Sequence, residues 1–206
     1  MTSPRGVSPI ASNNPPLVLA SESPRRLALL AQAGIVPAAV VPASIDESPF
    51  KGELPRAHAM RLARAKAETA AKAWVDAPAV ILAADTVVAC GRRILPKAET
   101  DEDVKICLAL LSGRRHVVMT AIAIVATDGA VRTRFVETRV TFKRLEQAEI
   151  DSYVRSGEGV GKAGGYAIQG RAETFVRQIN GSYSNVVGLP LLEAASLLRS
   201  CGVAIL

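Results

Sequence analysis

Short apolar runs alternate with amphipathic segments along the chain, a pattern that predicts a mixed α/β fold. The runs Leu17–Ala20 and Ala79–Ala84 are apolar throughout, as is typical of strands buried on both faces. A helix is predicted after the first run, with Ser23 at its N-cap, Pro24 in its first position and Gly34 at its end.

A longer helix is predicted to begin at Pro55. Apolar residues recur there at intervals of three and four, and they form a stripe of Met60, Ala63, Ala67, Ala71 and Trp74. Because most of this stripe is alanine, we expect the helix to pack closely against its neighbour.

The second half of the chain is rich in strands. Residues Thr86–Leu95 predict either a small hairpin or a strand with a turn, and Thr100–Asp103 resembles a capping box that begins a helix. An Asp-Gly turn between His116–Ala126 and Val131–Phe142 predicts a long hairpin. The remaining elements are a helix over Glu146–Arg155, a glycine-dense loop over Gly157–Gly170, a strand near Phe175–Ile179 and a helix from Pro190. We therefore expect a mixed, twisted sheet with flanking helices, in two lobes around a central cleft, within a single domain over residues 17–206.

Composition narrows the class of protein. Of the 206 residues, 49% are hydrophobic and 21% charged, which excludes a disordered chain, a collagen-like fibre and a disulfide-dense mini-protein. The net charge of +6 suits nucleic acid, an anionic membrane or a phosphorylated small molecule. Only 4% of residues are aromatic, and the basic residues do not gather in one stretch of the sequence. We therefore expect no nucleic-acid partner.

Residues 1–16 are rich in Pro, Ser and Asn and lack the apolar core of a signal peptide, so we expect a disordered lead-in. The most apolar stretch, Ala77–Cys90, is too short to span a membrane and contains Asp85. The cysteines, Cys90, Cys107 and Cys201, are odd in number and lack metal-site spacing, which favours a reducing compartment. We therefore expect a cytoplasmic protein with no membrane partner.

Two arginines stand where a helix dipole disfavours cations. Arg25 and Arg26 fall in the first turn of the helix that begins at Pro24. Either both point into solvent, or an anion binds there to free amides, to guanidinium groups and to the hydroxyl of Ser21 or Ser23. The position directly after a buried strand favours the anion site.

Three further charged residues have two interpretations each. Asp85 either caps a turn or reaches the same cleft as a metal ligand or general base. Lys97 is either a loop cation or a phosphate contact, and Lys66 either flanks the core with its charge in solvent or points into the cleft. For Lys66 the solvent-facing interpretation is favoured. The loop Gly161–Gly170 permits close approach to a ligand, but the chain has no Walker motif, which excludes an ordinary P-loop NTPase.

Several short motifs, taken in order, resemble those of the Maf family of nucleoside triphosphate pyrophosphatases. They are Ser21–Arg26 (SESPRR), Ile45–Glu47 (IDE), Arg61–Ala67 (RLARAKA), Ala84–Val88 (ADTVV), Gly164–Gly170 (GGYAIQG) and Asn185–Pro190 (NVVGLP). The resemblance covers roughly Leu17–Leu198, and an ordered set of motifs is more specific than any one of them. One departure is Lys97-Ala98, where many members have Lys-Pro.

The resemblance implies hydrolysis of a nucleoside triphosphate between its α and β phosphates, a two-lobed ITPase-like fold and a divalent cation, Mg²⁺ or Mn²⁺. It also implies a homodimer in many members. The form of the glycine-rich motif resembles the branch that acts on dTTP and UTP, and modified nucleotides are further expected targets.

The resemblance also implies roles for individual residues. The residues expected to hold phosphates are Ser21, Arg25, Arg26, Lys66 and Lys97. Glu47 and Asp85 would serve the metal and the attacking water, with Asp85 as proton acceptor, so Glu47, Lys66, Asp85 and Lys97 form the expected catalytic set. Gln169 would face the base, and Arg25, Thr86 and Gln169 are the expected specificity positions. The alternative is a nucleotide-binding regulator of cell division whose catalysis is incidental.

Overall fold

The structure is a computed structural model, and it describes residues 14–205. Most of the predicted disordered lead-in, residues 1–13, lies outside the described residues. Of its remaining residues, Pro16 accepts a hydrogen bond through its carbonyl from the amide of Val80 at 2.9 Å.

A seven-stranded sheet forms the centre of the molecule, in the order β2-β1-β3-β5-β6-β7, with β4 paired to β3. The strands are β1 (Leu17–Leu19), β2 (Ala39–Val40), β3 (Val80–Cys90), β4 (Arg93–Leu95), β5 (Arg115–Val125), β6 (Val131–Phe142) and β7 (Val176–Asn180). β1 runs parallel to β2 and β3, and the other pairs are antiparallel. The predicted mixed sheet is therefore confirmed, including the long hairpin of β5 and β6.

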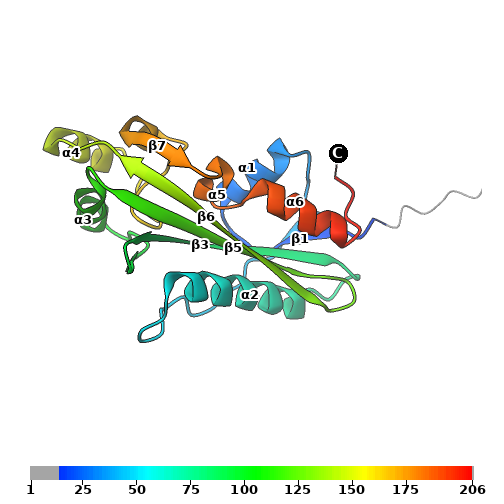
Figure 1. The fold of residues 1–206 in the computed structure, drawn as a ribbon. Coiled ribbons are helices and arrows are strands. Elements are labelled where there is room, and N and C mark those ends of the chain that lie inside the picture. Colours follow the sequence, from blue (N-terminus) through cyan, green and yellow to red (C-terminus); the bar gives the residue numbers. More distant parts are fainter. Residues whose placement is uncertain (1–13, 206) are drawn as a thin grey trace, which may run out of the picture.

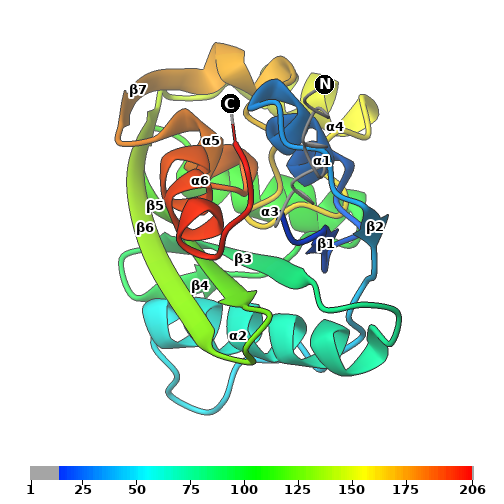
Figure 2. The same ribbon diagram turned by 90° about the vertical axis from the view of Figure 1, so that its right-hand side faces the viewer.

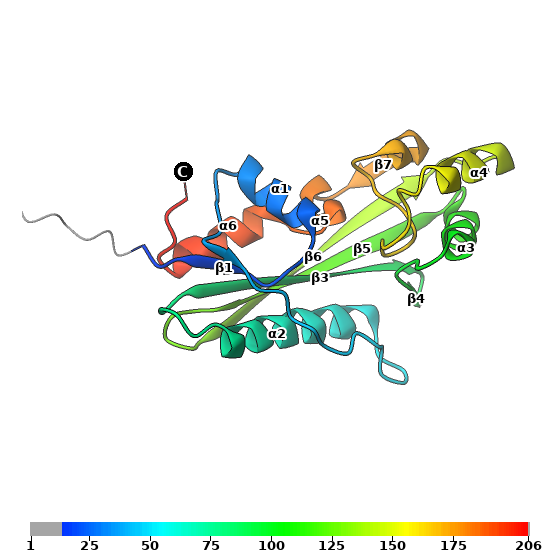
Figure 3. The same ribbon diagram turned by 180° about the vertical axis from the view of Figure 1, so that it is seen from behind.

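Helices cover both faces of this sheet. They are α1 (Pro24–Gln32), α2 (Pro55–Ala73), α3 (Asp101–Leu111), α4 (Gln147–Arg155), α5 (Tyr183–Val187) and α6 (Leu191–Ser200). α2 lies alone against one face, and α1, α5 and α6 lie on the other (Figure 1). The view in Figure 2 looks along the sheet and shows the same two layers. From behind, α3, α4 and β7 gather at the far end of the long strands (Figure 3).

The helix ends follow the sequence in most places. The capping box at Thr100 is confirmed, because its hydroxyl accepts from the amide of Asp103, whose carboxylate accepts from the amide of Thr100. Ser23 is the N-cap of α1 as predicted, but its side chain makes no capping hydrogen bond. The short helix α5 was not predicted, since five residues are too few for helical periodicity to show. Within residues 14–205, no helix has the length and apolar character that crossing a membrane requires.

Close packing through alanine joins α2 to the sheet, as predicted. The buried face of α2 consists of Pro55, His58, Ala59, Leu62, Ala63, Lys66, Ala67 and Ala70. It packs on small residues of the neighbouring strands, including Ala83 of β3 and Ala121 and Ala123 of β5. Met60 and Trp74 of the predicted stripe are only partly buried, so the true buried face is rotated slightly around the helix.

Strand β3 corrects one prediction. The sequence predicts a strand that ends at Asp85, whereas β3 continues without interruption from Val80 to Cys90. The strand continues because the buried Asp85 carboxylate has an ionic partner, Lys66, so it does not need a turn or solvent. The turn falls instead at Gly91, after which β4 pairs back on β3 as a small hairpin.

Candidate functional site

Between β1 and β4, one edge of β3 has no partner strand among the described residues, and several predicted site residues lie around this gap. On one side of β3, pairing with β1 ends at Leu82 and pairing with β4 begins only at Val88. The carbonyl of Leu82 accepts from the amide of Ala20 at 2.8 Å, and strand alternation directs the backbone groups of Ala84 and Thr86 to the same edge. Among the described residues, no strand pairs with them there. The gap therefore leads to side chains on both faces of β3.

Asp85 lies on the face that α2 covers, in an ion pair with Lys66. Lys66 Nζ lies 2.7 Å from Asp85 Oδ1 and 2.7 Å from Glu47 Oε1. The side chains of Lys66 and Asp85 are 11% and 8% exposed, whereas that of Glu47 is 51% exposed. The solvent-facing interpretation of Lys66 is thus wrong, because the helix turns this lysine toward the strand and the Asp85 carboxylate compensates its charge.

The charge balance around Glu47 keeps its carboxyl group ionised. Partial burial by itself would raise the pKa of Glu47, but the hydrogen bond and the charge of Lys66 outweigh this effect. Lys97 and Arg26 lower it further, so the pKa of Glu47 lies below its usual range. Glu47 is thus a carboxylate surrounded by cations from three other segments.

Arg26 lies across the gap, in contact with three separate segments. Its Nη1 donates to Ser21 Oγ at 2.9 Å, its Nε to the carbonyl of Gly188 at 2.9 Å and its Nη2 to Thr86 Oγ1 at 3.4 Å. The interpretation in which Arg26 points into solvent is therefore wrong. Burial lowers the pKa of the Arg26 guanidinium, and the negative charge of Asp85 opposes that lowering. Arg26 and Asp85 thus lie within electrostatic range, although they lie on opposite faces of β3.

A buried network that sequence reasoning missed supports Arg26 from behind. Thr86 Oγ1 lies 3.0 Å from Thr120 Oγ1, which donates to the carbonyl of Asn185 at 3.0 Å. The Asn185 side chain, fully buried, donates to the carbonyl of Val118 and to a threonine hydroxyl of β6. This network holds α5 against the sheet and so places the Gly188 carbonyl that Arg26 binds. Its signal in the sequence was the NVVGLP motif, from which no residue was carried over.

Three cations lie near one another beside this cluster. Lys97 forms a β-bridge with Ala163, and the Ala98 amide donates to the carbonyl of Lys162 at 3.0 Å. Burial, followed by the charges of Arg25 and Lys97, lowers the pKa of Lys162. Lys162 is therefore an additional cation that the predictions omitted, although the sequence places it in the glycine-dense loop. A proline at residue 98 would lack the backbone amide that donates this hydrogen bond to Lys162.

Gln169 lies on the glycine-dense loop, which hydrogen bonds join to β5 and α4. The Tyr166 hydroxyl lies 2.8 Å from His116 Nε2, and the Ala167 amide donates to the Tyr153 hydroxyl at 2.9 Å. Burial lowers the pKa of His116 to about 4, so this histidine is a neutral structural partner. Gln169 itself is exposed, and among the described residues no hydrogen bond joins it to the charged cluster.

The donor set fits the divalent cation that the resemblance implies. Glu47 and Asp85 offer hard carboxylate oxygens, the preferred ligands of Mg²⁺ and Mn²⁺, and a single ammonium group now binds both. Within residues 14–205, no group of three or more acidic, histidine or cysteine side chains could hold a metal. Two carboxylates suffice only where substrate phosphates and water complete the shell, as is common for Mg²⁺.

The site is defined by these charges and hydrogen bonds. Two hollows of about 320 and 450 Å³ lie elsewhere, one beside Gly34 and Val203 and one beside Trp74 and Val125. None of the predicted site residues lines either hollow.

Comparison with known proteins adds a sequence relationship to this geometry. The profile of the family described as Maf-like protein matches residues 16–201. A dTTP/UTP pyrophosphatase of Rhodopseudomonas palustris (strain HaA2) is 61% identical over 195 residues, covering 93% of this chain and 94% of the relative. A dTTP/UTP pyrophosphatase of Sphingopyxis alaskensis is 58% identical over 189 residues, covering 92% of this chain and 98% of the relative. Among solved structures, the HAM1 protein of Coxiella burnetii matches with a TM-score of 0.48 at 17% identity, covering 89% of this chain and 98% of that one.

Proposed function

This chain belongs to the family of Maf-like proteins, and on that premise we propose that it hydrolyses dTTP or UTP to the nucleoside monophosphate and pyrophosphate. The observation that carries the proposal is the position of Lys66, whose ammonium group binds Asp85 of β3 and Glu47 of a distant loop. The guanidinium of Arg26 lies beside the same gap. Cations and paired carboxylates from four segments thus converge, which is the arrangement that attack on a polyanion requires.

The proposed cations neutralise and orient the triphosphate, which carries about four negative charges. Arg26 is already directed across the gap by Ser21 and Gly188, so its guanidinium needs little reorganisation when an anion binds. Arg25, Lys97 and Lys162 supply further positive charge, since Lys97 acts on Glu47 and both Arg25 and Lys97 act on Lys162. Because the guanidinium of Arg26 is held by the Gly188 carbonyl and by Ser21, it would keep the phosphates in line with the attacking water.

Asp85 is the proposed proton acceptor. Its Oδ1 is held by Lys66, while Oδ2 makes no hydrogen bond to the residues that the structure describes. That second oxygen is free to accept a proton from water as it attacks the α phosphorus. Glu47 and Asp85 would hold Mg²⁺ or Mn²⁺, which when bound polarises phosphate oxygens and lowers the pKa of water.

The proposed choice of base follows from the names of the relatives, which are dTTP/UTP pyrophosphatases. Arg25, Thr86 and Gln169 are the proposed specificity residues, and modified nucleotides related to dTTP and UTP are further proposed substrates. None of the relatives named here is described as a regulator of cell division, so no observation favours that alternative. A homodimer and a cytoplasmic location stay predictions from the sequence.

The decisive experiment measures pyrophosphate release from dTTP, UTP, dCTP and ATP with Mg²⁺ or Mn²⁺. We expect the wild-type protein to prefer dTTP and UTP. Asp85→Asn should still fold, because Lys66 stays paired with Glu47, but it should lose at least about 100-fold in turnover. Asp76→Asn is the matched control, because Asp76 is exposed in the turn after α2, and it should match wild type. Near wild-type turnover by Asp85→Asn would reject the role of Asp85. Tight triphosphate binding without pyrophosphate release would instead support the regulator.

A further inference from the structure

The loop between β2 and α2 carries Glu47 and has almost no regular structure of its own. Residues 41–54 contain no helix or strand, and Glu47 is one of their exposed members. Its contact with Lys66 is a single ion pair at a half-exposed side chain, and such a pair contributes little against the entropy of ordering a loop. Something else must hold this loop in place.

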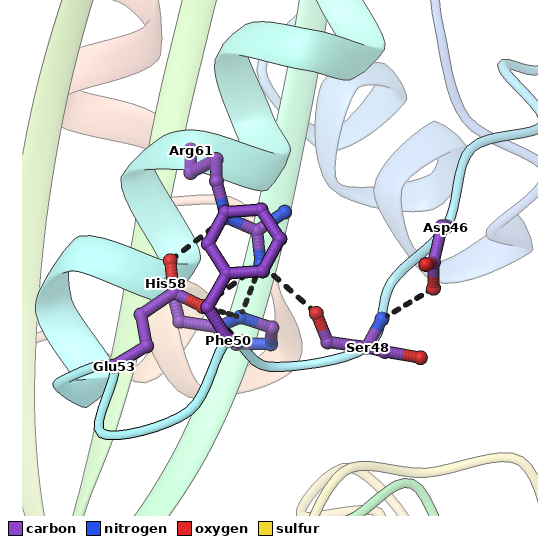
Figure 4. Close-up of polar contacts among 6 residues, drawn as sticks. All are labelled: Asp46, Ser48, Phe50, Glu53, His58 and Arg61. Carbon is purple, nitrogen blue, oxygen red and sulfur yellow. Dashed lines mark hydrogen bonds and ion pairs between the residues drawn. The ribbon is translucent and has the colours of Figure 1, made fainter.

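Arg61 of α2 binds the loop directly beside Glu47. Its Nη2 donates to the carbonyl of Ser48 at 3.0 Å. The guanidinium also lies over the ring of Phe50, 3.9 Å from the ring centroid, as Figure 4 shows. Phe50 itself is 64% exposed, so the stacking adds little to the core of the protein and acts mainly to order the loop.

Glu53 joins Arg61 to the loop backbone. Arg61 Nε donates to Glu53 Oε1 at 2.7 Å and Arg61 Nη2 to Glu53 Oε2 at 2.8 Å, the two-pronged geometry of a strong arginine–carboxylate pair. Glu53 Oε2 also accepts from the amide of Phe50 at 3.0 Å and lies 2.9 Å from His58 Nδ1 (Figure 4). The hydrogen bonds from Arg61 hold the pKa of Glu53 down at about 2.

The two ends of this arrangement lie on one helix. Lys66 binds Glu47 and Arg61 binds Ser48, so α2 holds two successive loop residues at once. We propose that Arg61, together with Glu53, is a positioning residue that keeps the Glu47 carboxylate next to Lys66 and Asp85. The importance of that position for turnover rests on the proposed function, whereas the ordering of the loop does not.

The first test follows the loop in the ligand-free protein by hydrogen exchange of peptides that cover residues 46–53. In Arg61→Ala, we expect this segment to exchange at least about tenfold faster than in wild type, because the local opening is no longer opposed. Arg64→Ala is the matched control: Arg64 lies one turn further along α2 and, among residues 14–205, pairs only with Glu68 on the surface. In Arg64→Ala, residues 46–53 should exchange at a rate within about twofold of wild type.

The second test is a double-mutant cycle in pyrophosphate release. Arg61→Ala should lower turnover about tenfold when Glu47 is present, but less than about twofold in a Glu47→Gln background. A merely structural role for Arg61 would lower turnover equally in both backgrounds. Should Arg61→Ala fail to fold, Arg61→Lys serves instead, since lysine keeps the charge but cannot make the paired hydrogen bonds.

Two results would overturn the proposal. One is unchanged exchange of residues 46–53 in the Arg61 variants, and the other is an equal loss of turnover with and without Glu47. If the wild-type protein releases no pyrophosphate from any triphosphate, the proposed function fails. The exchange experiment then still decides whether Arg61 orders the loop.

Discussion

The ion pair between Lys66 and Asp85 allows the sharpest prediction about this protein. Both side chains are almost completely buried, and the second partner of Lys66, the Glu47 carboxylate, is half exposed. Replacing the lysine by methionine keeps most of the volume and the apolar stem, but it leaves the Asp85 carboxylate without its cation. It also leaves two carboxylates near each other with no charge between them.

The magnitude follows from the difference in burial. Breaking a buried pair by removing one partner costs about 3–5 kcal/mol, because an uncompensated charge stays in the interior. Breaking an exposed pair costs about 0–1 kcal/mol. Lys66→Met should therefore lower the free energy of unfolding by about 3–5 kcal/mol and the melting temperature by about 10 °C. Glu47→Gln should lower the free energy of unfolding by less than about 1 kcal/mol.

Urea unfolding followed by circular dichroism at neutral pH measures these differences. Lys72→Met is the matched control, because Lys72 lies on the same helix but is exposed, and it should cost less than about 1 kcal/mol. If Lys66→Met costs no more than Lys72→Met, then Asp85 does not depend on the ammonium group. The reasoning that places the buried charge balance at this pair would then be wrong.

Two further predictions concern the segment that supports the glycine-rich loop. Burial lowers the pKa of His116 from 6.5 to about 4, so the unfolded chain takes up a proton at a higher pH than the folded protein does. Stability from this group is full above pH 6.5 and is lost as the pH falls toward 4, by about 3 kcal/mol in total. Urea midpoints across this range should fall less steeply in His116→Phe than in wild type, and parallel slopes would contradict the assignment. Gly164→Ala should destabilise by at least about 1 kcal/mol more than Gly161→Ala: both glycines have positive φ, but a Cβ at Gly164 would lie 2.9 Å from Val88 Cγ1, whereas at Gly161 it would meet open space. Equal urea midpoints for the two alanine variants would show that Val88 yields without cost.

Several parts of the site could be predicted from local sequence because they are local in the structure. Arg26 follows a buried strand and begins a helix, and its misfit with the helix dipole already indicated a role beyond solvation. The structure confirms that Arg26 does not point into solvent, since Ser21, Thr86 and Gly188 bind it, and the anion site stays a prediction.

The wrong predictions concern charged residues whose ionic partners lie far away in the sequence. Lys66 and Asp85 are 19 residues apart, and neither residue by itself shows that it has a partner. Taken alone, an aspartate in an apolar run predicts the end of a strand, and a lysine beside a helical stripe predicts a solvent-facing charge. The contribution of Arg61 was missed for the same reason, because its partners Ser48 and Glu53 lie in a loop without periodicity.

The sequence by itself determined the order of the longer elements, the capping of α3 and the alanine face of α2, since each depends on residues within a few positions of one another. Only the tertiary structure decided that β3 is open at one edge between β1 and β4. The same holds for the pairing of Asp85 with a lysine from α2 and for the attachment of the Glu47 loop to that helix. These features depend on contacts between segments that are far apart in the sequence, and local propensity carries no information about such contacts.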